Sequence, residues 1–251
     1  MLLKRIMPCL LLKERRLVKT TNFENPRYIG DPINAVKIYN DKEVDELIVM
    51  DILASKKDIP IDFDLIKGFA SECFMPLAYG GGVRTLKDFQ TLFRIGVEKV
   101  IVNTLLFDNP SIVKEAAIKF GNQSIVASVD VIKNGDGGYN IFSHSNRVIT
   151  KSLDEYLEFV ISCNVGEMVV TSVDSEGTWN GYDVDLIDYI NKRISIPIIA
   201  NGGAGCNDDL RDILYQTNVE AAAIGSMAVY QKKGMGVLIR FPKREDVINE
   251  E

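Results

Sequence analysis

A long internal repeat constrains the fold of this chain more than any other feature of its sequence. The segment PLAYGGGVRTLKDFQTLF, which begins at Pro76, matches PIIANGGAGCNDDLRDIL, which begins 121 residues later at Pro197. Upstream, ELIVMD from Glu46 lies over EMVVTS from Glu167 at the same offset, and downstream GVEKVIVNT lies over NVEAAAIGS after a one-residue insertion. Two matching halves predict that the chain is built from two copies of one structural unit.

Short apolar, β-branched runs recur along the chain, and most precede an amphipathic segment with helical spacing. Thr85 and Ser152 each stand three positions before an acidic residue, which is the spacing of a capping box, and Asn109 precedes Pro110 as an N-cap precedes a proline at the first helical position. We expect eight strands, at Ile6–Leu12, Leu47–Ile52, Leu77–Tyr79, Val100–Asn103, Ile125–Asp130, Met168–Ser172, Ile198–Ala200 and Ala221–Gly225.

The alternation of strands and helices indicates the architecture. Strands that are apolar on both faces and separated by helices are typical of a parallel sheet covered by helices. Eight such units favour a closed barrel over an open sheet, and 251 residues is an ordinary size for one α/β barrel. We therefore predict an α/β fold with a single (βα)8 TIM-barrel domain over residues 1–251, made of tandem half-barrels at about 1–121 and 122–251.

Charge and composition exclude several classes of protein. The 29 basic and 35 acidic residues give a net charge of −6, which argues against nucleic acid as a partner, because neutralising phosphates requires a basic surface. No apolar run approaches the roughly 20 residues that cross a bilayer, and the amino terminus lacks the pattern of a signal peptide. The four cysteines lack CxxC spacing, and no metal-ligand cluster is apparent. We expect a cytoplasmic protein with free thiols, no cofactor, no metal and no membrane partner.

Glycines and small polar residues gather where strands end. In a barrel of this type the reactive face lies at the carboxyl ends of the strands, and glycine allows backbone N–H groups to approach an anion closely. The repeat doubles this pattern and predicts two phosphate sites on opposite walls, suited to an elongated ligand with a phosphate at each end. The alternative, that the glycines only make tight turns, stays open. The residues concerned are Gly80, Gly81, Gly82, Asn103 and Thr104 in one half, and Gly202, Gly203, Gly225 and Ser226 in the other.

Few titratable residues are candidates for proton transfer. Asp130 is the best, because it ends the apolar run VASVD, where partial desolvation would tune its proton affinity, although it could instead cap a helix or anchor a loop. We expect Asp51 and Asp174 to organise loops. Lys19 lies in a long, polar first loop that could act as a mobile lid and bring a cation to a phosphate, or it could simply be solvated. His144, the only histidine, is expected at the surface.

Four charged residues form a second pattern at the opposite ends of the strands. Each stands just before an expected strand, so all four should ring the bottom opening of the barrel. The two positive and two negative charges balance, as a gate or a docking surface would require. The alternative is ordinary solubilising charge, because exposed ion pairs contribute only about 0–1 kcal/mol. The four residues are Arg5, Glu46, Lys99 and Glu167.

Taken together, the motifs KRIMPCL, YGGGVRT, VNT, VDSEGT, GYD, ANGGAG and IGS resemble the cyclase (HisF-type) subunit of imidazole glycerol phosphate synthase between about Leu3 and Tyr230. The resemblance implies a barrel that receives ammonia from a glutaminase subunit docked at its bottom face, as a heterodimer. It also implies a reaction in which a ribulosyl-formimino carboxamide ribotide with two phosphates gives imidazole glycerol phosphate and an aminoimidazole carboxamide ribotide.

The resemblance also implies roles for individual residues. The bottom ring corresponds to the ammonia gate, Lys19 to the catalytic lysine of the first loop, and Asp130 to one of two catalytic aspartates. One phosphate site corresponds to Gly82, Asn103 and Thr104, and the other to Gly177, Gly203, Gly225 and Ser226.

This chain departs from the family pattern at the first strand. The family motif PCLD is replaced by PCLL, so Leu11 stands where the second catalytic aspartate is expected. Cyclisation needs a proton donor and an acceptor on opposite walls, and loss of one typically lowers the rate by about 10²–10⁴-fold. Glu176 replaces the usual aspartate, and GVLIRFP, which begins at Gly236, resembles a strand more than the expected eighth helix.

PCLLLK, GDPINA at Gly30 and ECFMP at Glu72 resemble a divergent branch of the family found with surface-polysaccharide (lipopolysaccharide) genes. That resemblance implies delivery of ammonia to a sugar amidotransferase that converts an acetamido group to an acetamidino group. We therefore expect an ammonia-supplying subunit of this kind, acting as an enzyme on a phosphorylated ligand or mainly as a conduit. Histidine-pathway cyclisation is the alternative, and a phosphate-binding isomerase that acts alone ranks last.

Overall fold

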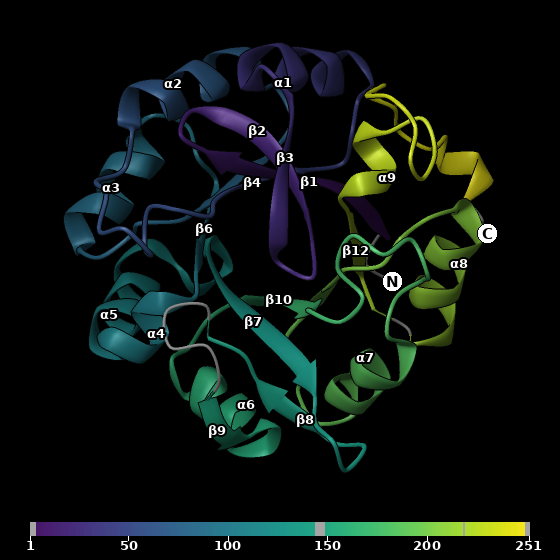
Figure 1. The fold of residues 1–251 in the computed structure, drawn as a ribbon. Helices are drawn as coiled ribbons and strands as arrows, with labels where there is room; N and C mark the ends of the chain where they lie inside the picture. The colour runs from purple at the N-terminus through teal and green to yellow at the C-terminus, as the bar shows by residue number, and fades with distance from the viewer. Residues whose placement is uncertain (1–3, 144–148, 218, 249–251) are drawn as a thin grey trace.

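A computed structural model describes residues 4–143, 149–217 and 219–248. Eight parallel strands form a closed barrel surrounded by helices, because the first and last strands of the barrel pair with each other and every other neighbouring pair is also parallel (Figure 1). The predicted TIM barrel is confirmed, and each expected strand lies within three residues of its predicted bounds. The strands are β1 (Arg5–Lys13), β4 (Leu47–Asp51), β5 (Leu77–Gly80), β6 (Lys99–Val102), β7 (Ile125–Lys133), β10 (Glu167–Ser172), β11 (Ile198–Asn201) and β12 (Ala221–Ile224).

The helices cover the outer face of the barrel (Figure 1). The Thr85 capping box is present, and the Ser152 hydroxyl accepts a hydrogen bond from the backbone N–H of Glu155, as the sequence predicts. Asn109 precedes its helix but accepts a hydrogen bond from Ser111 Oγ instead of capping the backbone. The helices are α1 (Pro32–Asp41), α2 (Phe63–Glu72), α3 (Leu86–Arg94), α4 (Thr104–Asp108), α5 (Pro110–Phe120), α6 (Leu153–Ser162), α7 (Val184–Asn191), α8 (Asn207–Gln216) and α9 (Ser226–Val229), with 3₁₀ turns at Asn122–Ser124 and Arg244–Asp246.

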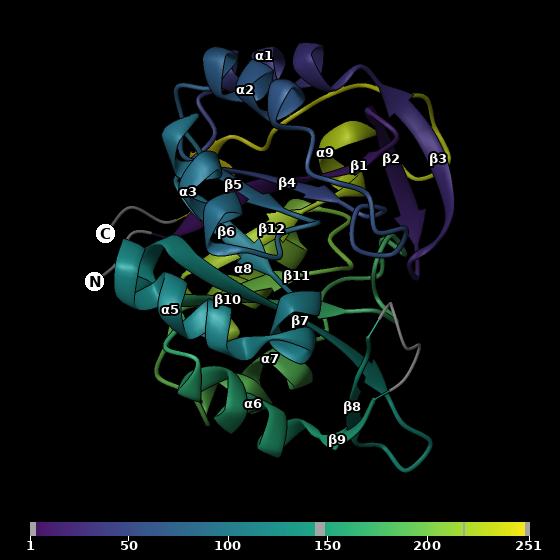
Figure 2. The same cartoon turned by 90° about the vertical axis from the view of Figure 1, so that its left-hand side faces the viewer.

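Two hairpins extend the barrel at the end where the strands finish. β1 continues into β2 (Arg16–Thr21) and β3 (Glu24–Gly30), while β7 continues into β8 (Tyr139–Ile141) and β9 (Ile149–Ser152). Figure 2 shows both at one end of the barrel, with the two termini at the other end. Phe23 and Phe142, one from each extension, contact each other with ring centroids 6.0 Å apart. β1 and β7 therefore each carry an antiparallel extension.

The first hairpin corrects one expectation. The segment predicted as a mobile polar loop is an antiparallel pair of strands, because RLVKTT contains β-branched residues that favour extended backbone. Lys19 is consequently buried instead of solvated, with only 4% of its surface exposed.

Within the described residues, the chain after β12 forms only a short α-helix. α9 has four residues, and the following segment runs extended, with Leu238 N–H donating to the Val229 carbonyl and Arg240 N–H to that of Ala228. The prediction that GVLIRFP is not helical is confirmed, although its strand character is reduced to one bridge between Tyr230 and Val237. No helix within the described ranges is long and apolar enough to cross a membrane. His144, predicted at the surface, lies outside the described residues.

Candidate active site

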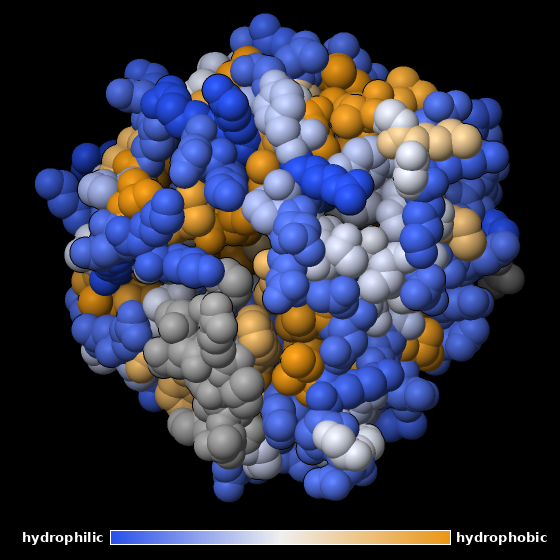
Figure 3. All heavy atoms as spheres, in the orientation of Figure 1, coloured by the Kyte–Doolittle hydropathy of each residue, from blue (hydrophilic) through white to orange (hydrophobic). Residues whose placement is uncertain are grey.

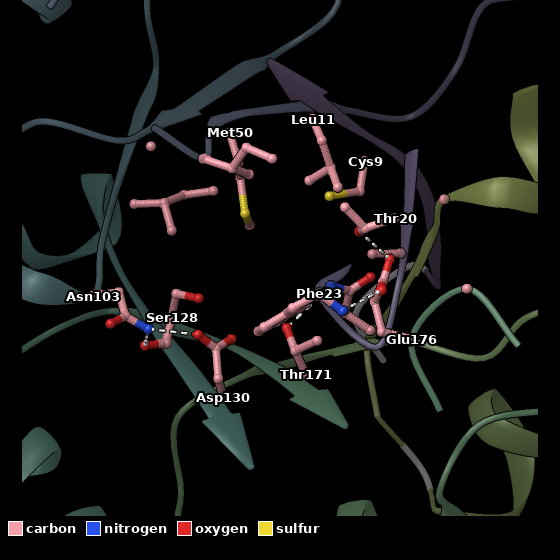
Figure 4. Close-up of a pocket in the computed structure, with 18 of the residues that line it drawn as sticks. Cys9, Leu11, Thr20, Phe23, Met50, Asn103, Ser128, Asp130, Thr171 and Glu176 are labelled. Carbon is pink, nitrogen blue, oxygen red and sulfur yellow. Dashed lines mark hydrogen bonds between the residues drawn. The ribbon is translucent and has the colours of Figure 1, made fainter. Parts of the chain in front are cut away.

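A cavity of about 190 Å³ opens at the carboxyl ends of the barrel strands. Its two walls differ in chemistry, as Figure 4 shows. One wall presents the side chains of Cys9, Leu11 and Met50, from β1 and β4. The other presents polar side chains from β6 to β11, namely Asn103, Ser128, Asp130, Thr171 and Asn201. A ligand in this cavity would therefore face an apolar surface on one side and hydrogen-bonding groups on the other.

Asp130 is the carboxylate of the polar wall. It lies within β7, three residues before the strand ends, and its side chain is 9% exposed. Asn103 Nδ2 donates to its Oδ2 at 2.9 Å, and the Thr171 hydroxyl donates to it as well. Burial raises the pKa of Asp130 to about 7, against the opposing effect of these hydrogen bonds. The carboxyl can thus accept or release a proton near neutral pH, and it faces the cavity instead of capping a helix.

Leu11 faces the same cavity from β1. Of the carboxylates that line the cavity, Asp51 is engaged in its own turn, where its Oδ1 accepts hydrogen bonds from the backbone N–H groups of Leu53 and Ala54. That contact fulfils the loop-organising role predicted for Asp51. Glu176 also lines the cavity and contributes to the raised pKa of Asp130, but its carboxylate is engaged in hydrogen bonds to the first hairpin.

Lys19 reaches the cavity from β2. Its ammonium donates a hydrogen bond to the Cys9 carbonyl oxygen and lies beside Gly225, where a Cβ atom would stand 3.2 Å from Nζ. Burial lowers the pKa of Lys19 below its ordinary value, although nearby Glu176 opposes that shift. The structure thus places this lysine at the glycine turn after β12, which is one of the predicted phosphate sites.

Glu176 holds the first hairpin beside the cavity through hydrogen bonds. Its carboxylate accepts hydrogen bonds from Thr20 Oγ1 at 2.9 Å and from the Phe23 backbone N–H at 3.0 Å. The Asn22 side chain adds hydrogen bonds to the carbonyls of Val173 and Asp174. The sequence marked Glu176 only as a replacement, and no local pattern could have revealed partners more than 150 residues away. These bonds hold the strand that carries Lys19.

The predicted phosphate-binding residues occupy two parts of the cavity wall. The glycines combine tight turns with access to the cavity: Gly203 has φ +111°, and a Cβ there would meet the Gly181 carbonyl oxygen at 1.9 Å. Gly82 stands apart, since its N–H donates to Ser55 Oγ at 3.2 Å and it does not itself line the cavity. The structure brings the others to the cavity: Asn103 and Thr104 on one side, and Gly177, Gly203, Gly225 and Ser226 on the other.

At the opposite end of the barrel, Arg5, Glu46, Lys99 and Glu167 form a closed ring of ion pairs. Lys99 Nζ lies 2.8 Å from Glu46 and 2.7 Å from Glu167, while Arg5 lies 2.8 Å from Glu46 and completes the ring through Glu167. The two glutamates are 2% and 4% exposed. This burial does not fit the alternative of ordinary solubilising charge. Burial raises the pKa of Glu46, although the adjacent Lys99 opposes the shift.

The barrel interior between the ring and the cavity is apolar. Alternate residues of the strands point inward, as the two-residue period of a strand requires, and they form a buried cluster. Its members are Met7, Cys9, Ile48, Ala78, Ile101, Val126, Val169, Ile199, Ala221 and Ala223. No group of three or more potential ligands that could hold a metal is found among the residues that the structure describes, and the four cysteines, all within that part, are free.

Comparison with known proteins identifies relatives along nearly the whole chain. Residues 5–234 match the family described as histidine biosynthesis protein. A protein of Pseudomonas aeruginosa, provisionally named imidazole glycerol phosphate synthase subunit hisF2, is 44% identical over 243 residues, which are 96% of this chain and 97% of that protein. A Vibrio vulnificus protein provisionally named subunit hisF3 is 40% identical over 96% of this chain and 94% of its own length. A Leptospira interrogans protein with the provisional name subunit HisF is 40% identical over 98% of both chains.

Proposed function

The chain belongs to the histidine biosynthesis protein family as a HisF-like cyclase-type subunit, and we propose that it takes ammonia from a glutaminase subunit and supplies it to a sugar amidotransferase. The acceptor reaction is the conversion of an acetamido group on a surface-polysaccharide sugar to an acetamidino group. One contrast carries this proposal. The ring of four charges at the bottom of the barrel is complete, whereas Leu11 leaves the cavity at the top with a single proton-transferring carboxylate on the polar wall.

Ammonia enters, in this proposal, through the ring of Arg5, Glu46, Lys99 and Glu167, against which the glutaminase docks. The apolar interior beyond the ring favours the neutral NH₃ molecule, because an ammonium ion would lose its hydration there without gaining a partner. The same apolar interior excludes bulk water from the path of the ammonia. The residues of the interior therefore support passage of ammonia from the bottom face to the cavity.

The residues of the cavity at the top are better suited to binding a phosphorylated ligand than to catalysing cyclisation of the ribotide. The glycine turns and the Lys19 ammonium suit a phosphorylated ligand, and Asp130 can exchange a proton near neutral pH. Cyclisation of the ribotide, however, needs an acid and a base on opposite walls, and Leu11 can serve as neither. The sugar amidotransferase then takes up the ammonia at this end of the barrel.

A second function, the histidine-pathway cyclase reaction, has its own supporting observation. Asp130, Lys19 and most residues of both phosphate sites line one cavity, as a cyclase would require. In that case the chain would convert the ribulosyl-formimino carboxamide ribotide with one carboxylate.

A coupled assay separates the two functions. The protein is mixed with its glutaminase subunit, glutamine and the ribulosyl-formimino carboxamide ribotide, and both glutamate formation and loss of the ribotide are followed. We expect the barrel to raise glutamate formation by about tenfold or more while the ribotide persists. Consumption of the ribotide would establish the cyclase function instead, and a glutaminase that does not respond to the barrel would refute the proposed role.

A further inference from the structure

The outer helical layer of the barrel is incomplete at one position. Within the described residues, seven of the eight barrel strands are followed by a helix of at least eight residues, whereas β12 is followed by the four-residue α9 and an extended segment. A crevice remains between this segment and α1. It is lined by Leu17 and Ile29 of the first hairpin, Ala35 and Ile38 of α1, and Leu238 and Ile239 of the segment.

Apolar side chains are exposed along this crevice. Met235, Val237 and Leu238 are 51%, 47% and 54% exposed, and Tyr28 on the neighbouring strand β3 is 63% exposed. Figure 3 shows apolar surface gathered between α1 and the segment after α9. Contiguous exposed apolar surface on a soluble fold marks an interaction site more often than single exposed residues do. We call the surface formed by Tyr28, Met235, Val237, Leu238 and the crevice the apolar strip.

Basic residues surround the apolar strip, although the whole chain is acidic. Residues 231–244 contain five basic residues and no acidic one, in a chain of net charge −6. Lys243 and Arg244 form ion pairs with Glu245 and Asp45, so the positive charge that a partner would meet on this segment comes mainly from Lys232, Lys233 and Arg240. On the hairpin side, the Arg16 guanidinium lies 5.9 Å from the centre of the Tyr28 ring. Asp31 is an acidic residue of the crevice, and its carboxylate is engaged in capping α1. A partner would therefore meet an apolar strip with a predominantly basic border.

From these observations we propose that the apolar strip binds an acidic amphipathic helix of the ammonia-accepting sugar amidotransferase. The inference rests on the proposed function for the identity of the partner. A helix fits because the crevice lies beside α1, where apolar residues at helical spacing would pack against the exposed side chains. Acidic residues on the outer face of that helix would complement the basic border.

Two further arguments favour this occupant over a second copy of the chain. A two-fold dimer through this surface would place the basic border of one copy against that of the other, which is unfavourable. The apolar strip also includes β3 of the hairpin that carries Phe23 over the cavity, so a protein bound here stands beside the mouth from which ammonia emerges.

The test uses the full chain and synthetic helices as probes. A fluorescein-labelled peptide of about 18 residues, five helical turns, carries leucine at positions i, i+3, i+4 and i+7 and glutamate elsewhere. A second peptide replaces every glutamate with lysine. Anisotropy titrations should show that the acidic peptide binds at least tenfold more tightly than the basic one. Leu238→Glu should weaken binding of the acidic peptide at least tenfold, whereas Ile118→Glu, at an exposed position on α5, should leave it unchanged.

Three results would overturn the inference: equal binding of both peptides, binding insensitive to Leu238→Glu, or a wild-type dimer that Leu238→Glu converts to a monomer in sedimentation. Glutamine hydrolysis by the glutaminase in the presence of Leu238→Glu serves as the control for folding and should match the wild type, because the glutaminase is proposed to dock at the other end of the barrel. If the wild-type barrel itself fails to stimulate the glutaminase, the proposed function fails while the result for the helix-binding site stands.

Discussion

Charged side chains have different partners at the two ends of the barrel. At the bottom, each of Arg5, Glu46, Lys99 and Glu167 pairs with two oppositely charged neighbours, so the charges of the ring balance within the chain, although Glu46 Oε1 is buried without a hydrogen-bond partner among the described residues. At the top, Asp130 has only neutral hydrogen-bond donors and faces an apolar wall. The four charges of the ring are paired without any ligand. Within the described part of the chain, the Asp130 carboxylate has no such ion pair, so a bound ligand could supply the opposite charge. The comparison indicates that the charges at the bottom stay paired, whereas the carboxyl group at the top can change its protonation state.

The largest effect should follow from breaking the ring. Glu167→Ala removes one of two anions and leaves Arg5 and Lys99 short of a partner in a largely buried site. Breaking a buried ion pair on one side typically costs about 3–5 kcal/mol, and the partial exposure of both cations places the expected loss near the lower value. Urea unfolding would measure it. Glu158→Ala, at an exposed position in the middle of α6, is the control and should change the free energy of unfolding little. An equally small change in both variants would contradict the structural role of the ring.

The next effect concerns Asp130 and depends on pH. Its pKa is raised to about 7 in the folded state from an ordinary value of 3.8, so folding favours the protonated form. The resulting destabilisation is fully present above pH 7, shrinks as the pH falls from 7 towards 4, and is absent below the unfolded value. Asp130→Asn should therefore raise the free energy of unfolding at pH 8 by on the order of 2–4 kcal/mol, and by less at pH 5. An increase in the free energy of unfolding that is equal at pH 8 and pH 5 would show that the pKa of Asp130 is not raised as the structure indicates.

Much of this comparison could be predicted from the sequence, because the residues that precede the strands lie at one end of a barrel and those that follow them lie at the other. The 121-residue repeat and the charges that precede four expected strands predict the barrel and the ring. Leu11 predicts the loss of one catalytic aspartate, but not the apolar wall that it forms with Cys9 and Met50. The first hairpin is harder to predict, because the charged and polar residues of RLVKTT are typical of a loop, whereas Val18 and the threonines favour a strand. The bonds of Glu176 to Thr20 and Phe23 depend on that hairpin and could not be predicted before it.

A smaller change in the free energy of unfolding should follow from placing a carboxyl group at position 11. Leu11→Asp places a second carboxyl group in a partly buried, apolar position, which should lower the free energy of unfolding by about 1–3 kcal/mol at pH 8. If the new carboxylate lies near Asp130, like-charge repulsion raises the apparent pKa of the pair above 7. Infrared titration of the carboxyl bands measures this change. Leu11→Asn is the matched neutral control and should leave the pKa of Asp130 near 7.

The Leu11→Asp variant also tests the alternative function. If only the missing acid prevents cyclisation, this variant should consume the ribotide with glutamine and the glutaminase at about 10² times the wild-type rate or more. Continued inactivity would indicate that the cavity differs from a cyclase site by more than one residue, which agrees with the conduit function.

The smallest expected effect concerns the contact between Glu176 and the first hairpin. Glu176→Asp shortens the side chain by one methylene, so its carboxylate cannot reach both Thr20 Oγ1 and the Phe23 N–H. Loss of one hydrogen bond contributes about 1 kcal/mol, which should speed hydrogen exchange of the Phe23 amide by about fivefold. Exchange at the strands that carry the ring should not change. Glu24→Asp, an exposed position on the same hairpin, is the control. Arg5 of the ring lies on β1, which continues into this hairpin and pairs with it. Faster exchange confined to the hairpin would therefore show that the two ends open independently despite this shared strand, whereas faster exchange at both ends would show that closure of the cavity is coupled to the ring.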